Sequence, residues 1–260
     1  MADSIDTTTG KPDYTTLTFP APPAHRPYVI LNMVESLDGR ATIEGNERGL
    51  GSTVDQGLMR ELRVHADVVV NGASTLRASG TSPRLGNSAL EAIRIERGKS
   101  RSPYGAVLSQ SGDLPLDRLF FTSTEFQAYI YLSSAASEER RAAIEATGRG
   151  VIVVPEGDEV RSMLAHMRTE LGASLALVEG GPTLNGALLE AGFVDEIFVT
   201  LGPVLVGGRD PLTIIHQQRE RSNDGTRHLR LLHAHANPDT NEVYLRYRLV
   251  PASVPGSGPD

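Results

Sequence analysis

A glycine turn that follows a buried strand carries the clearest chemical signal in the sequence. Residues 179–183 read Glu-Gly-Gly-Pro-Thr and connect an apolar run to a helical pattern. The two glycines let the backbone approach a ligand closely, Pro182 fixes φ for a first helical turn, and the free N–H groups around Thr183 point at an anion. The turn indicates a phosphate cradle, although an ordinary strand-to-helix turn explains the same residues equally well.

Residues 68–77 repeat this arrangement. Gly72 ends a second apolar strand, and Ser74 and Thr75 open what we expect to be a short helix. Two such cradles can hold the two ends of a pyrophosphate. Neither turn contains the Gly-x-Gly-x-x-Gly of a Rossmann unit, and the Gly-Lys-Ser at 98–100 lacks the upstream glycine of a nucleoside-triphosphate loop. The pattern therefore disfavours both phosphoryl transfer and a Rossmann fold.

Composition and charge narrow the class of protein. The chain has 260 residues, 39% of them hydrophobic, which suffices for one large domain or two small ones, and we expect one. The formal net charge of -7 and a pI of about 5.5 argue against a nucleic-acid or anionic-membrane partner. The absence of cysteine excludes disulfides, thiolate nucleophiles and iron–sulfur ligation.

Short apolar runs alternate with amphipathic stretches along the chain, as in α/β layer proteins. Runs that are apolar throughout, such as 68–70 and 151–154, predict strands covered by helices on both faces. The last two runs alternate polar and apolar residues around a turn at 237–241, which predicts an antiparallel hairpin at the edge of a mixed sheet. We expect strands at 28–34, 67–71, 106–109, 128–132, 151–154, 175–179, 195–201, 228–235 and 242–250, and the clearest helices at 54–65, 138–147, 159–171 and 183–191.

The ends of the chain differ from its middle. Residues 1–26, rich in Thr and Pro, have little to bury and are expected to be flexible or to lie extended on the surface. They lack an apolar run long enough for a signal peptide or a membrane span, so we expect a cytoplasmic protein without a membrane partner. Residues 27–250 are predicted to form a single domain, followed by a flexible tail at 251–260. The basic stretch 80–103 looks least ordered and indicates either a loop near an anionic ligand or a solvated connection.

Three segments, in this order along the chain, resemble a known family. They are Asn-Met-Val-Glu-Ser-Leu-Asp-Gly-Arg at 32–40, Leu62-Arg63 ahead of Gly72-x-x-Thr75, and Val-Glu-Gly-Gly-Pro-Thr-Leu at 178–184. Together they resemble the pyrimidine reductases of riboflavin biosynthesis, including the reductase half of bifunctional deaminase-reductases. The resemblance implies a three-layer αβα, dihydrofolate-reductase-like fold with a central, mostly parallel mixed sheet, a homodimer, and NADPH as cofactor.

The reaction implied by this resemblance is hydride transfer to C1 of a phosphoribosylamino-pyrimidine, which opens the ribose to a ribityl chain. The cofactor carries the chemistry, so the protein needs mainly to align donor and acceptor. The 2,5-diamino substrate and the deaminated 5-amino-6-(5-phosphoribosylamino)uracil both stay compatible with the sequence, as does NADH. Two other functions stay open: a reductase of dihydrofolate or another pterin or pyrimidine on the same fold, and a nucleotide-binding protein without turnover.

The resemblance also implies roles for residues on the substrate side. Asn32 and Glu179 would be catalytic, with Asn32 polarising the substrate by a hydrogen bond near the point where hydride arrives. Glu179 would also bind substrate together with Glu47, Arg63 and Arg84, and Arg63 would meet the phosphate. Simpler interpretations are a buried structural amide for Asn32, a helix-dipole carboxylate for Glu179 and a surface arginine for Arg63.

The cofactor would lie along the two glycine turns. Its pyrophosphate would contact the turns themselves, its nicotinamide half the backbone near Glu35, and its 2′-phosphate the serines that follow two predicted strands. The cofactor-binding residues implied are Glu35, Gly72, Ser74, Thr75, Ser109, Ser133, Ser134, Gly180, Gly181, Pro182, Thr183, Leu184 and Asn185.

The chain departs from the family pattern in two places. Several relatives carry a Glu-Ser-x-Trp stretch where this chain reads Gly-Asn-Glu-Arg-Gly-Leu-Gly at 45–51, and the chain has no Trp. Many bifunctional relatives have Asp-Asp-Pro after the second helix, whereas residues 78–80 here are Ala-Ser-Gly. We therefore expect a different substrate pocket. We expect no metal site, because His233 and His235 share one face of a predicted strand but have no evident third ligand.

Overall fold

The structure is a computed structural model that describes residues 6–209, 212–217 and 226–250. It contains a ten-stranded sheet in the order β1-β9-β10-β8-β2-β7-β3-β4-β5-β6. The strands from β8 to β6 in this order are parallel, whereas β10 is antiparallel to both β8 and β9. The strands are β1 (Asp6–Thr9), β2 (Tyr28–Ser36), β3 (Val68–Gly72), β4 (Tyr104–Ser109), β5 (Ala128–Ser133), β6 (Gly150–Val154), β7 (Leu175–Val178), β8 (Glu196–Gly202), β9 (Leu229–Asn237) and β10 (Glu242–Leu249).

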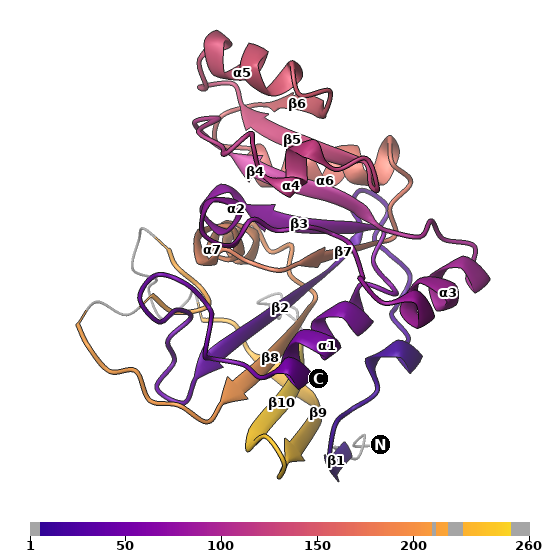
Figure 1. The fold of residues 1–260 in the computed structure, drawn as a ribbon, viewed down its shortest axis with the longest axis vertical. Coiled ribbons are helices and arrows are strands. Elements are labelled where there is room, and N and C mark those ends of the chain that lie inside the picture. The colour runs from indigo at the N-terminus through magenta and orange to yellow at the C-terminus, as the bar shows by residue number, and fades with distance from the viewer. Residues whose placement is uncertain (1–5, 210–211, 218–225, 251–260) are drawn as a thin grey trace, which may run out of the picture.

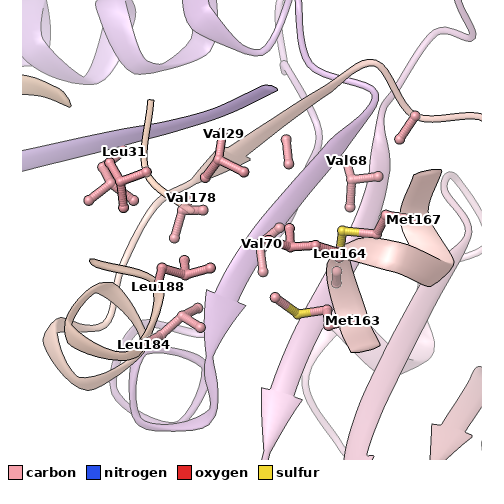
Figure 2. Close-up of a cluster of buried hydrophobic side chains, with 14 of the residues drawn as sticks. Val29, Leu31, Val68, Val70, Met163, Leu164, Met167, Val178, Leu184 and Leu188 are labelled. Carbon is pink, nitrogen blue, oxygen red and sulfur yellow. The ribbon is translucent and has the colours of Figure 1, made fainter. Parts of the chain in front are cut away.

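Helices cover both faces of this sheet (Figure 1). They are η1 (Tyr14–Thr16), α1 (Thr53–Leu62), α2 (Ala73–Ser79), α3 (Ser88–Glu96), α4 (Leu119–Thr122), α5 (Glu138–Glu145), α6 (Glu159–Thr169) and α7 (Pro182–Glu190). Alternation along the strands separates two cores, since successive side chains point to opposite faces. On one face, Ile30, Val69 and Leu177 pack under α1. On the other, Leu31, Val70 and Val178 pack with α6 and α7, as Figure 2 shows for Met163, Leu164, Leu184 and Leu188. The predicted three-layer αβα architecture with a mostly parallel sheet is confirmed.

The prediction that residues 1–26 have little to bury is wrong for their described part. β1 pairs in parallel with β9. The ring of Tyr14 is 6% exposed and packs edge-on against Phe198 of β8, with 5.2 Å between ring centroids. Two isolated aromatic rings, Tyr14 and Phe19, produce no periodic pattern among Thr and Pro residues, so the sequence did not indicate that this segment packs against the core. As a result, the predicted C-terminal hairpin is present but does not form the sheet edge, because β1 lies outside it. The predicted tail at 251–260 lies outside the described residues.

The stretch 80–103 is more ordered than its composition indicates. Asn87 caps α3, and its side chain accepts hydrogen bonds from the first backbone N–H groups of the helix. Arg94 faces neither solvent nor a ligand: it is 1% exposed, and its guanidinium donates to the carbonyl oxygens of Arg63 and Ala66, both at 2.6 Å. Burial lowers its pKa to about 10. Arg94 therefore anchors the connection between α1 and β3.

Candidate active site

Four neighbouring strands place polar side chains on one floor beside α1. Ile30, Val69, Leu177 and Phe198, one from each of β2, β3, β7 and β8, are buried in the core under this helix. The residue two positions further along each strand points to the same side. These residues are Asn32, Asn71, Glu179 and Thr200. The same alternation that builds the core therefore assembles the polar floor at the carboxyl ends of the strands.

A cleft of about 410 Å³ opens over this floor. Asn32, Asn71 and Glu179 line it, and the first and the third are residues for which the sequence predicts a role at the substrate. The segment 41–51 and the outer side of α1 form its walls, and Glu47 lies on the first of these as expected. The cleft also contains residues that sequence reasoning missed, namely Met33, Asp55, Gln56, Met59, Arg60, Ser79, Thr81 and Ser82.

Glu179 and Arg63 form a buried ion pair at the inner end of the cleft. Arg63 Nε lies 2.6 Å from Glu179 Oε1, and Nη2 lies 2.7 Å from Oε2, a bidentate arrangement. The side chains are only 8% and 5% exposed, and Arg63 Nη1 donates to the carbonyl oxygen of Arg84. The sequence placed both residues at the substrate but did not predict that they bind each other. Arg63 thus orients Glu179, and most of its donors are already used.

The two glycine turns lie against each other. Gly72 N donates to the carbonyl oxygen of Gly180 at 2.8 Å, and the Gly180–Gly181 peptide bond is cis. A methyl group on Gly181 would lie 2.9 Å from Thr75 Oγ1 and 3.0 Å from Ser74 Oγ. Only glycine leaves this space free, so the close approach of the two turns explains the residue type.

A second cleft, of about 650 Å³, begins on the far side of these turns. Among the predicted cofactor residues it includes Gly72, Ser74, Ser109, Thr183 and Leu184, while Thr75, Gly180, Gly181 and Pro182 line the first cleft. Two arginines, Arg77 of α2 and Arg161 of α6, also lie along it, and the second was not predicted from the sequence. The clefts therefore meet at the paired turns and provide two compartments with one junction.

Five predicted site residues have side chains that the structure employs elsewhere. Ser133 Oγ donates to Glu159, and Ser134 Oγ accepts from Glu156 N, so both hold the end of β5. Asn185 is fully buried, and its Nδ2 donates to the carbonyl oxygen of Ile214 at 2.8 Å. Arg84 pairs with Glu125 at 2.7 Å in an adjoining cleft. Glu35 lines neither of the two main clefts, and burial raises the pKa of its carboxyl group. In this conformation the contacts of Ser133, Ser134, Asn185 and Arg84 stabilise the walls of the site.

The Ser-Leu-Asp-Gly-Arg motif forms a structural clamp. Ser36 Oγ donates to Asp38 Oδ1 at 2.7 Å, and the backbone N–H groups of Val206 and Gly207 donate to the same carboxylate. These hydrogen bonds hold the pKa of Asp38 well below its ordinary value. The motif thus joins the end of β2 to the segment that follows β8.

Asp55 is the most informative of the missed residues. It occupies the third position of α1 after the cap Ser52, so the sequence Ser-x-x-Asp looks like a helix cap and nothing more. In the structure it lines the first cleft. Burial raises its pKa to about 6, and this rise is opposed by the neighbouring Thr200 and reinforced by Glu242.

The fold and the clefts define a class: three-layer α/β proteins whose ligands bind at the carboxyl ends of a mostly parallel sheet. The RibD C-terminal domain family matches residues 27–244, and the chain belongs to this family. A solved pyrimidine reductase-like protein from Corynebacterium diphtheriae is 22% identical, with a TM-score of 0.78 over 87% of this chain and 93% of that one. This agreement shows that the two proteins share one fold.

Two curated relatives are similar to this chain in sequence. The 2,5-diamino-6-ribosylamino-4(3H)-pyrimidinone 5′-phosphate reductase of Archaeoglobus fulgidus is 27% identical over 190 residues, or 73% of this chain and 86% of the relative. The protein of the same name from Aquifex aeolicus is 28% identical over 213 residues, or 79% and 90%.

The described residues were searched for membrane-spanning helices and for groups of metal ligands. Within them, no helix has both the length and the apolar character needed to cross a bilayer. The rings of His233 and His235 stack on β9 with 5.9 Å between centroids. In the part of the chain that the structure describes, no group of three or more His, Cys, Asp or Glu side chains could hold a metal ion.

Proposed function

We propose that the protein is an NADPH-dependent reductase that converts a phosphoribosylamino-pyrimidine of riboflavin biosynthesis to its ribitylamino form. The observation that carries the proposal is the junction of the two clefts at the paired glycine turns, beside the polar floor of Asn32 and Glu179. The names of the relatives, which are pyrimidine phosphate reductases, support the substrate class.

The residues at the junction suit a dinucleotide. The glycines keep the space between the turns free of side chains, and α7 begins with Pro182, leaving unpaired N–H groups for a phosphate. The second cleft continues from there with Arg77 and Arg161, whose charges suit a 2′-phosphate. When bound, NADPH supplies the hydride. The protein residues assigned to hold it are Gly72, Ser74, Thr75, Arg77, Ser109, Arg161, Gly180, Gly181, Pro182, Thr183 and Leu184.

The first cleft then holds the pyrimidine and its sugar. Glu179, fixed by Arg63, accepts hydrogen bonds from substrate donors, and Asn32 polarises the group that receives hydride. Arg63 has most of its donors engaged, so the substrate phosphate needs another cation. Arg60 lies one turn earlier on α1, lines the same cleft, and has no hydrogen bond or ion pair within the described part of the chain. Arg60 is therefore assigned to the phosphate.

The experiment that tests the proposal is a substrate panel. Purified protein is mixed with NADPH or NADH and with the diamino phosphoribosyl pyrimidine, its deaminated form, or dihydrofolate. We expect loss of NADPH absorbance with a phosphoribosyl pyrimidine and slower oxidation of NADH. Turnover of dihydrofolate alone would point to a pterin reductase, and NADPH binding without any turnover to a binding protein.

Two variants sharpen this test. Glu179→Gln should lower kcat by about 10²-fold or more, because a preorganised charged acceptor is lost. The matched control Glu145→Gln, on an exposed part of α5, should leave kcat unchanged. We also propose that the protein is a homodimer, which sedimentation of the purified protein checks by its mass.

A further inference from the structure

Asp55 has a position in a helix cap but no task in it. A carboxylate three residues after a Ser cap normally accepts a hydrogen bond from the backbone N–H of that Ser. Here Ser52 N donates to Glu242 Oε1 at 2.6 Å, and Ser52 Oγ donates to Glu242 Oε2 at 2.7 Å. Glu242, which comes from β10, has replaced Asp55 in the cap. The carboxyl group of Asp55 is thereby left to the first cleft, which it lines.

The groups around Asp55 favour a carboxyl that exchanges its proton near neutral pH. Burial has the largest effect on its pKa, which is raised to about 6. The neighbouring Thr200 from β8 opposes this rise, and Glu242 from β10 and Tyr14 from η1 lie close enough to interact electrostatically. The other charged residues that line the cleft are Glu47, Arg48, Arg60, Arg63 and Glu179. A general acid is most effective when its pKa lies near the working pH.

The position of Asp55 along the sheet brings it near the reacting end of the cleft. Its neighbour Thr200 is in register with Val34 of β2, and Val34 follows Asn32 by two residues on the same face. At about 3.3 Å per residue, Asn32 and Val34 are about 7 Å apart along the strand. Glu179 is less suited to give up a proton, because both its carboxylate oxygens already accept hydrogen bonds from Arg63.

We propose that Asp55 donates the proton that the ring oxygen of the substrate ribose takes up when the bond between that oxygen and C1 breaks. This inference rests on the proposed function. The electron pair of the broken bond stays on the oxygen, which becomes a hydroxyl group with the proton of Asp55. C1 gains a hydride from the dihydronicotinamide cofactor, which is oxidised in the same turnover. The Asp55 carboxylate then regains a proton from water.

The test compares Asp55→Asn with Glu61→Gln, which neutralises a carboxylate on the same helix that instead binds Lys11 and the backbone of Tyr14. For the wild type, kcat should fall as pH rises above the pKa of Asp55. In Asp55→Asn, kcat should drop by about 10²- to 10⁴-fold and lose this pH dependence. The Kd for NADPH, measured by fluorescence titration, should change little. Glu61→Gln should retain both the rate and the pH dependence.

Two further measurements keep the result interpretable. Asp55→Glu retains a carboxyl group, so it should recover part of the rate together with a pH-dependent limb. Infrared difference spectra across the titration should show a protonated-carboxyl band that Asp55→Asn lacks, which does not depend on turnover. If the wild type turns over and Asp55→Asn has the same kcat or the same pH dependence, the role of Asp55 is overturned while the proposed function stands. If none of the pyrimidine substrates supports NADPH oxidation by the wild type, the proposed function and this inference are overturned together.

Discussion

The buried pair Arg63–Glu179 should respond to mutation as a unit. Arg63→Met leaves the Glu179 carboxylate buried without its cation, and Glu179→Gln does the same to the guanidinium. Removing one partner of a buried ion pair costs about 3–5 kcal/mol in the free energy of unfolding. Arg63→Met also releases the carbonyl oxygen of Arg84, which adds about 1 kcal/mol.

The double variant should be less destabilised than the two single costs predict. It carries no uncompensated charge, so the coupling free energy should be about 2–3 kcal/mol. Urea denaturation followed by far-ultraviolet circular dichroism measures all four proteins, and constant m-values would show that two-state unfolding is preserved. The exposed pair Arg141–Glu145 is the control, with an expected coupling of about 0.5 kcal/mol or less. Additive costs at Arg63 and Glu179, within about 0.5 kcal/mol, would refute the argument that each residue mainly satisfies the other.

Three further predictions concern other parts of the molecule. Arg94→Met leaves the carbonyl oxygens of Arg63 and Ala66 without their donor and should lower the free energy of unfolding, measured by heat or urea, by about 3 kcal/mol. The control Arg101→Met, at a side chain that is 71% exposed, should lower it by about 0.5 kcal/mol or less. Gly181→Ala places a methyl group against Thr75 Oγ1 and should weaken NADPH binding by about tenfold or more, equivalent to about 1.4 kcal/mol, in fluorescence titrations. The control is Gly57→Ala, because Gly57 of α1 has open space around it. An unchanged Kd for NADPH in Gly181→Ala would contradict the phosphate cradle. Asp55→Asn should be more stable than the wild type by about 3 kcal/mol above pH 7, because the folded-state pKa is raised from 3.8 to about 6. The wild type loses stability as pH rises from 3.8 to about 6, because its buried carboxyl group must become charged. The difference in stability between the two proteins should therefore vanish below pH 3.8. A difference that is constant with pH would count against the raised pKa.

Much of the fold could be predicted because its elements repeat with simple periods. The apolar run at 68–70 became the buried parallel strand β3, and the Gly-Pro-Thr sequence at 181–183 marked the start of α7. The run at 151–154 also became a parallel strand, β6, but the prediction that helices cover both its faces is wrong at Val153, which is 43% exposed on this edge strand. The glycine turns could also be predicted, since close approach of two backbones selects glycine whatever the ligand.

The remaining features depend on partners that are distant in the sequence. Arg94 looked like a solvated or ligand-binding charge because the carbonyl oxygens it binds belong to the end of another helix. Asp55 looked like a cap residue because the group that displaces it, Glu242, is almost at the other end of the chain. Arg63 and Glu179 were both placed at the substrate, but their pairing was not predicted, because an ion pair leaves no mark on either local pattern. A rule that sequence reasoning did not apply would have found Asn71, which stands two residues beyond the core residue Val69 on the same face of its strand.

The strand β1 has a consequence for how the protein behaves at high concentration. It pairs along the outer side of β9, which would otherwise present a row of unpaired backbone N–H and C=O groups. Such rows template strand addition between molecules, and proteins protect them by covering or shortening the edge. A four-residue strand therefore acts as a guard against self-association. Deleting residues 6–9 should leave the clefts in place but make the protein prone to aggregation through β9.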